Sequence, residues 1–376
     1  MEALKNGCLL VDKDNQTAYA LAKEGSCFTA YQLSTYQKQP DWLKSYEMDG
    51  LDRFPNSERT DLVYLLVWQQ EVSAVEDTEL AEVALNGVDT TARLKTFGRV
   101  QIQPGIKASD CVSAWEEVKT LWKDKGIGDV AETGEIKTDI KLKVDFSNQE
   151  ESTNLCSPTI SGGYVGADNQ TLLVSTLFDR YLTWAFNNAS SLHRIRITSD
   201  RKTVEFETLP KDAFHYPKVG QFVEILAWSS ELSNGEKTAE IMGPLTSVAR
   251  DFNPEDFTLM LADGYPSEYP IEDNEGHPIV LYLRVWEGLL PLKLGEAIPL
   301  GNTGVSVTIT GKLNSSYLLD MFVLRKREFW TIAVRPKTPQ EIYPKRLRIE
   351  QSPDGIRRFV CPLALIKWTK TDPLGE

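Results

Sequence analysis

The residues best suited to acid–base or metal chemistry are sparse in this chain, which contains only three histidines. His193 lies in an alternating basic stretch, His215 precedes a Tyr-Pro pair, and His277 precedes a proline. No two of them stand at H-x-H or H-E-x-x-H spacing, which would place two imidazoles on one metal ion. We therefore expect each histidine to be a surface or loop residue rather than a ligand or a general base.

Motifs for nucleophilic and phosphate chemistry do not occur in the sequence. There is no G-x-S-x-G elbow and no G-x-x-x-x-G-K-[ST] loop. The G-x-G at 126–128 follows a predicted helix rather than a strand, which is the wrong context for a dinucleotide site. The acidic turns at 12–15 and 273–276 do not match the twelve-residue calcium loop. We expect no catalytic residue, no cofactor and no metal. A carboxylate pair of the glycosidase kind stays open, because sequence spacing does not fix spatial separation.

The composition is that of a folded, acidic chain of several domains. Its 376 residues are 41% hydrophobic and 25% charged, with a formal net charge of −13. That charge disfavours a nucleic-acid partner, whose phosphates need lysine and arginine. The N-terminal residues lack a long apolar stretch, so we expect no signal peptide. The longest apolar runs are also far shorter than the roughly 20 residues that span a bilayer.

The five cysteines stand far apart, and no C-x-x-C occurs among them. This spacing predicts reduced thiols rather than a disulfide framework or a zinc site.

Most of the chain has the pattern of short strands separated by turns. The run at 61–72 is almost entirely apolar at its centre and predicts a central strand, and 99–103 predicts another. Nine further strands are predicted after residue 160, several with clean alternation. They are 182–186, 193–198, 203–208, 221–228, 257–261, 279–286, 305–310, 329–334 and 359–365. Together they predict a mainly β fold of sandwiches or small barrels.

One segment, 109–125, predicts an amphipathic helix. Its apolar residues recur at spacings of four, three and four, so they share one face. Trp115 and Trp122 belong to this stripe and are candidate interaction residues. A ligand platform is one interpretation, but such a stripe more often packs in a core or an interface.

We expect three domains in chain order. The first is an N-terminal β-rich domain at 1–155 that contains the helix. A central β domain at 156–250 and a C-terminal β domain at 251–376 follow it. The boundary near 155 is suggested by the polar, glycine-containing connector at 126–160.

Two basic stretches contrast with the negative net charge of the chain. Arg325 and Arg327 belong to the first, and Arg346 and Arg348 belong to the second. A chain with such segregated charge could pair acidic and basic faces between neighbouring copies. A solvated basic face is the alternative.

Several motifs occur in a fixed order along residues 36–368. They are Q-P-D at 39–41, Y-L-L-V-W-Q-Q-E-V-S-A-V-E-D at 64–77, E-V-A-L-N-G-V-D-T at 82–90, G-G-Y-V-G-A-D-N-Q at 162–170, L-T-W at 182–184, V-G-Q-F-V-E at 219–224, V-W-E-G at 285–288, F-W-T-I-A at 329–333, D-G-I-R at 354–357 and P-L-A-L at 362–365. In this order the chain resembles an uncharacterised family of bacterial β-rich proteins associated with phage-tail-like contractile injection systems. It departs from that pattern at 184–189, where W-A-F-N-N-A replaces W-S-R-D-N-G.

The resemblance implies a non-catalytic structural subunit of a phage-tail-like particle, at the baseplate or its periphery. The implied partners are sheath, tube or baseplate proteins and further copies of the chain, with no nucleic acid and no membrane span. Assembly would occur in the cytoplasm, and the particle would then associate with a membrane or be released. Two other functions remain open. They are a carbohydrate- or surface-binding module of the tail-fibre kind, and a polysaccharide hydrolase.

Overall fold

The structure is a computed structural model, and it confirms the mainly β fold with one α-helix in the part of the chain that it describes. The described residues are 8–12, 17–21, 31–33, 58–85, 87–125, 127–147, 162–177, 180–187, 191–241, 243–272, 276–312 and 328–368. At the N-terminus β1 (Cys8–Asp12), β2 (Thr17–Leu21) and β3 (Tyr31–Leu33) form an antiparallel sheet in that order. The rest of the fold consists of three further bodies.

The first body is a sheet of three long antiparallel strands, which we call the long sheet. Its order is β24 (Arg358–Trp368), β4 (Arg59–Val72) and β7 (Arg93–Gln103). Alternate side chains of β4 pack against helix α1 (Cys111–Asp124), which the sequence predicts at 109–125. The Asp110 side chain caps this helix by accepting hydrogen bonds from two amides of its first turn. The small hairpin β8 (Asp129–Val130) and β9 (Ile136–Lys137) follows it.

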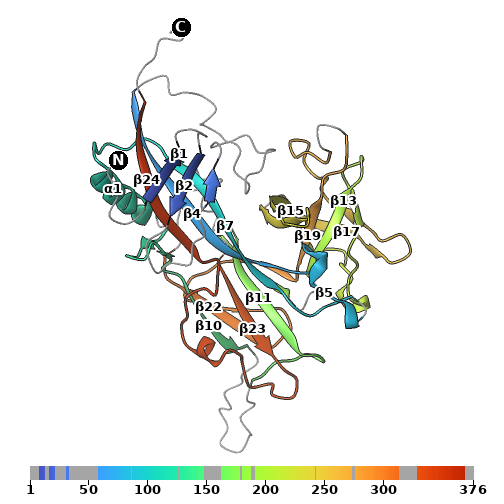
Figure 1. The fold of residues 1–376 in the computed structure, drawn as a ribbon. Helices are drawn as coiled ribbons and strands as arrows, with labels where there is room; N and C mark the ends of the chain where they lie inside the picture. Colours follow the sequence, from blue (N-terminus) through green and yellow to red (C-terminus); the bar gives the residue numbers. More distant parts are fainter. Residues whose placement is uncertain are drawn as a thin grey trace, which may run out of the picture.

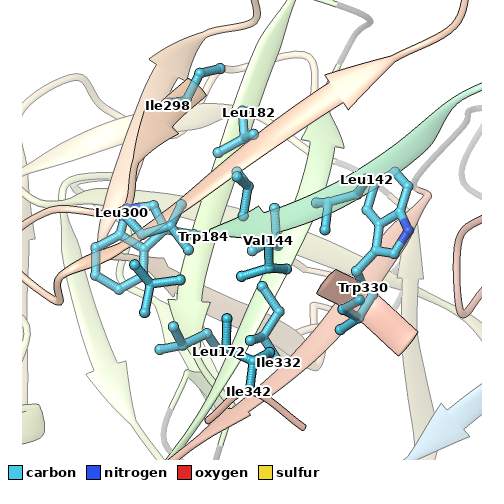
Figure 2. Close-up of a cluster of buried hydrophobic side chains, with 14 of the residues drawn as sticks. Leu142, Val144, Leu172, Leu182, Trp184, Ile298, Leu300, Trp330, Ile332 and Ile342 are labelled. Atoms are coloured by element: carbon cyan, nitrogen blue, oxygen red, sulfur yellow. The ribbon is translucent and has the colours of Figure 1, made fainter. Parts of the chain in front are cut away.

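The second body is a sandwich of two antiparallel sheets. One contains β10 (Lys141–Phe146), β22 (Val305–Thr310) and β21 (Ala297–Pro299). The other contains β20 (Gly288–Pro291), β12 (Tyr181–Phe186), β11 (Gln170–Leu177) and β23 (Phe329–Val334). The inward residues of both sheets form one apolar core. Figure 2 shows Val144, Leu172 and Ile332 meeting there, with Trp184 and Trp330 on opposite sides.

The third body is a closed barrel of six antiparallel strands. Their order is β15 (Phe222–Glu231), β17 (Leu245–Asn253), β18 (Thr258–Leu261), β14 (Thr203–Phe206), β13 (Leu192–Ile197) and β19 (Leu281–Trp286). Pairing of β15 with β19 closes the barrel, and β16 (Lys237–Ile241) adds to β15 from outside. The short helix η4 (Ala213–His215) lies in the β14–β15 connection. Inward Ile, Val, Leu and Phe side chains fill the interior.

The three bodies are nested along the chain rather than sequential. The barrel is inserted between β12 and β20 of the sandwich, and the sandwich lies between β7 and β24 of the long sheet. Figure 1 shows the C-terminal strand β24, in red, beside β4, in blue. Strand pairing therefore crosses both expected boundaries, near 155 and near 250. The reason is that a boundary inferred from local composition carries no information on pairing between distant strands.

The connection between β4 and β7 forms a folded tip that we call the crown (residues 73–92). It contains η2 (Thr78–Leu80), β5 (Ala81–Glu82), η3 (Val83–Leu85) and β6 (Val88–Asp89). Figure 1 shows this tip, labelled β5, beside the barrel. The crown thus extends from the end of the long sheet to the inserted barrel.

Candidate functional site

The base of the crown buries a carboxylate against the barrel. Glu76 is 3% exposed, and its Oε1 accepts a hydrogen bond of 2.8 Å from the backbone N–H of Ala239 on β16. Its Oε2 accepts a hydrogen bond of 3.0 Å from the N–H of Ser73. The side-chain amide of Gln70 donates to the carbonyl of Ala239 at 2.6 Å. These contacts join the end of β4 to the outer strand of the barrel, and we call this region the crown junction.

Local sequence explains why Glu76 turns inward at this point. The N–H groups of Glu76 and Asp77 both donate to the carbonyl of Ser73, which forms a tight turn after β4. The Glu76 side chain then returns to accept from the Ser73 N–H. This reciprocal pairing at S-x-x-E spacing resembles the capping box of helix starts.

A second carboxylate extends the junction to its more exposed side. Glu236, in the β15–β16 turn, accepts hydrogen bonds from the N–H of Thr78 at 2.7 Å and from the guanidinium of Arg194 at 3.1 Å. Arg194 also donates to the backbone carbonyl of Glu76. Asn234 donates to both Asp77 and Glu236. The crown and the barrel are therefore linked by several charge-assisted contacts.

The outer face of the barrel under the crown carries several polar side chains, although some of them are buried. In the strand register Arg194 faces Tyr282, and Arg284 faces Glu224. Glu224 is 1% exposed and accepts from the indole N–H of the buried Trp286 at 3.2 Å. The phenol of Tyr282 donates to the carbonyl of Lys237 on β16. Neighbouring strands and the crown supply hydrogen-bond partners to Glu224, Tyr282 and Arg194.

Burial dominates the electrostatics of the crown junction. Desolvation raises the pKa of Glu76 to about 7, and the amides of Ser73 and Ala239 and the field of Arg284 oppose it only in part. Desolvation also raises the pKa of the Tyr282 phenol, so it stays protonated and acts as a donor. For Glu236 burial raises the pKa, but hydrogen bonds from Thr78 and Arg194 outweigh it and lower the pKa overall. Glu76 is therefore the group that changes charge near neutral pH.

A second buried carboxylate lies at the opposite end of β4. Asp61 is fully buried and accepts from the guanidinium of Arg59 at 2.8 Å through both of its oxygens. It also accepts from the N–H of Gly105 at 3.0 Å and from the indole N–H of Trp368 at 2.7 Å. This arrangement ties β4, β24 and the turn after β7 together.

The two tryptophans of the helix stripe lie against the long sheet. Trp122 is 1% exposed, donates to the side-chain oxygen of Gln103 at 3.0 Å, and packs edge-on against Tyr64. Trp115 is partly buried beside it. This geometry favours packing of the tryptophan stripe in the core over its use as a ligand platform. It leaves no indole face of Trp122 for a partner.

The second basic stretch lies at the surface of the sandwich. It forms η5 (Lys345–Arg348), which is anchored by the buried Leu347. Arg346 pairs with Asp354, and Arg348 lies 3.4 Å from a carboxylate oxygen of Asp145. Arg325 and Arg327 of the first basic stretch lie outside the described residues.

The histidines are placed differently from one another. His277 is exposed in a loop, as expected. His215 belongs to η4 in a loop, but its ring is largely buried, with Nδ1 2.7 Å from Asp212. For His193 the expectation is wrong, because this residue is 2% exposed inside the barrel against Phe206. His193 shares the inward face with Ile195 because the two residues are two positions apart on a strand.

Two features of the described part of the chain bear on metal and membrane binding. No group of three or more His, Cys, Asp or Glu side chains there is arranged to hold a metal ion. The acidic turns at 12–15 and 273–276 lie mostly outside the described residues. No helix among the described residues is both long enough and apolar enough to cross a bilayer.

Sequence patterns did not identify the crown junction as a site. The barrel residues that contact Glu76 lie more than 100 residues away in the sequence. The usable signal is the S-x-x-E spacing of Ser73 and Glu76, which marks a self-capping turn.

In three comparisons the chain significantly matches no protein-family model, no curated protein and no solved structure.

Proposed function

We propose that this chain is a non-catalytic structural subunit of a phage-tail-like particle of the contractile-injection type, at the baseplate or its periphery. The ordered motifs along residues 36–368 support the particle class, because they resemble a family associated with such systems. The mainly β architecture of several bodies is consistent with a building block. In such particles a subunit acts by holding its neighbours in register through repeated heterologous contacts.

The observation that carries the proposal is the exposed apolar surface of the crown on a firmly held base. Val83 is 89% exposed and Leu85 is 56% exposed at the tip of the crown. Glu76 and Glu236 hold the base of the crown on the barrel. An element that is held on the fold by hydrogen bonds and exposes apolar side chains suits protein association.

The carboxylates of the crown junction also fit a structural role. Glu76, Glu224 and Glu236 accept hydrogen bonds from backbone amides, an indole and a guanidinium of this chain. Each of these contacts joins one element of the fold to another. The carboxylates thus fix the geometry of the body that neighbouring subunits would meet.

The experiment is to purify particles from the source cells on a density gradient and identify their proteins by mass spectrometry. We expect the chain in the particle fraction at a fixed ratio to sheath, tube and baseplate proteins. In cells that lack the sheath protein, the tube and sheath should leave that fraction, while the chain should stay with baseplate proteins. Light scattering on the isolated chain measures its oligomeric state. A monomer that accompanies none of these proteins would refute the proposal, and glycan binding and cleavage would then be tested.

A further inference from the structure

The crown is an acidic segment with an exposed tip. Residues 73–92 contain five carboxylates and neither lysine nor arginine. Glu76 is buried at the base, but Glu79 and Glu82 are exposed near the tip. They precede the exposed Val83 and Leu85 in the chain. The crown therefore presents an apolar tip with an acidic border, and a partner must offer apolar contact together with positive charge.

A surface with those complementary properties occurs on the sandwich of the same chain. We call Lys345, Arg346, Arg348 and Ile349 the basic patch. Three of these four residues are cationic, and Ile349 is an apolar side chain that is 66% exposed. The sequence from 342 to 349 holds no carboxylate.

Each cation of the basic patch lies within 4 Å of a carboxylate of the same chain. Lys345 pairs with Glu341, which is 43% exposed, Arg346 with Asp354, and Arg348 with Asp145, which is 38% exposed. The side chains of Lys345 and Arg346 are 72% and 46% exposed, whereas that of Asp354, which pairs with Arg346, is 19% exposed. Arg348 is 40% exposed and lies over the ring of Phe146 at 5.0 Å. Lys345 and Arg346 are thus more exposed than the carboxylates that pair with them, and the exposed Ile349 lies close to them in the chain.

We propose that the crown of one copy docks on the basic patch of a second copy, so that the chain associates head to tail. Val83 and Leu85 would pack against Ile349, and the exposed carboxylates of the crown would face Lys345 and Arg346. The inference rests on the proposed structural function and names the partner for that assembly. Charge complementarity, together with an apolar centre on each side, selects a second copy as the occupant.

The position of the two surfaces sets the kind of assembly. The crown lies beside the barrel, and η5 packs against β10 of the sandwich. Because they are different surfaces, each bound copy keeps one crown or one basic patch unused. Such a heterologous contact extends to further copies until a ring closes. It should also weaken as salt concentration rises.

The test uses two charge-reversed variants of the full chain. The crown variant is Glu79→Lys with Glu82→Lys, and the patch variant is Lys345→Glu with Arg346→Glu. By analytical ultracentrifugation at low salt, we expect the wild type to form concentration-dependent oligomers. Each variant alone should associate at least about tenfold more weakly. Mixing the two should restore association, because an intact crown then meets an intact patch and a reversed crown meets a reversed patch.

Two controls separate this contact from general effects of charge and folding. Glu205→Lys with Glu255→Lys makes the same charge change at exposed positions of the barrel and should associate like the wild type. A chain that carries both the crown and the patch reversals should regain association, because the charges are complementary again. Circular dichroism should show the wild-type fold in each variant.

Three outcomes would overturn the inference. They are a wild type that stays monomeric at every concentration tested, variants that associate like the wild type, or a mixture that stays monomeric. If the chain nevertheless enters particles, the proposed function stands and the crown binds another particle protein. If it enters no particle and does not self-associate, both proposals fail.

Discussion

The two ends of strand β4 each bury a carboxylate, but they compensate it differently. At the start of the strand, Asp61 receives both a guanidinium and two neutral N–H donors. At the far end, Glu76 receives only backbone amides and a hydroxyl, and Arg284 acts on it through its field. A buried charge is tolerated when a cation and hydrogen bonds replace water, and otherwise its proton affinity rises. We call the Asp61 end of β4 the fixed end. We call the Glu76 end the adjustable end, because the charge of Glu76 changes near neutral pH.

The largest expected effect comes from removing the carboxylate at the fixed end. Asp61→Ala would leave Arg59, the Gly105 N–H and the Trp368 indole without their shared acceptor. We expect the free energy of unfolding in urea to fall by about 3 kcal/mol. Asp129→Ala is the matched control, because it removes an exposed partner of Lys123 and should leave stability nearly unchanged. Equal effects of the two substitutions would contradict the comparison.

The next effect is a pH dependence from the adjustable end. The folded pKa of Glu76 is raised to about 7 from 4.5, so the folded chain binds a proton that the unfolded chain releases. This group therefore stabilises the fold least at high pH, and its contribution falls as pH rises from 4.5 through 7. Between pH 5.5 and pH 8 we expect a loss of about 2 kcal/mol.

Glu76→Gln is the variant that isolates this effect, since it cannot ionise. Urea unfolding of wild type and variant at both pH values measures the difference. The loss on raising the pH should be smaller in the variant by about the same 2 kcal/mol. If both proteins lose the same stability between the two pH values, Glu76 is not the titrating group.

The strands were predictable because their signal is local, whereas the nesting was not. All nine strands predicted after residue 160 are present, since alternation is set within each segment. The pairing of β24 with β4 joins residues almost 300 positions apart, and nothing in either strand specifies its partner. For the same reason, the sequence alone does not reveal the crown junction. Ser73 and Glu76 are visible in the sequence, but the Ala239 amide and Arg284 that define their environment come from the inserted barrel.

A smaller effect is expected at the exposed side of the crown junction. Glu236→Gln keeps an oxygen acceptor for Thr78 but removes the charge that pairs with Arg194. Both side chains are partly solvated, so we expect a loss of about 1 kcal/mol in urea unfolding. High salt should reduce this difference between wild type and variant. A loss as large as that of Asp61→Ala would mean that the crown end is as tightly compensated as the fixed end.

The smallest effect is expected at the crown tip. Val83→Ser with Leu85→Ser removes apolar side chains that are already exposed to water. The free energy of unfolding should stay within about 0.5 kcal/mol of the wild type. If this variant is clearly less stable in urea, the tip belongs to the core of the chain rather than to a binding surface.

Hydrogen exchange at one amide tests most directly whether the crown end is the adjustable one. The Ala239 N–H donates to Glu76 and is freed when the crown opens from the barrel. After correction for intrinsic exchange, its protection in the wild type should fall about tenfold between pH 6 and pH 8. In Glu76→Gln this fall should disappear. Equal pH dependence in the two proteins would contradict the account.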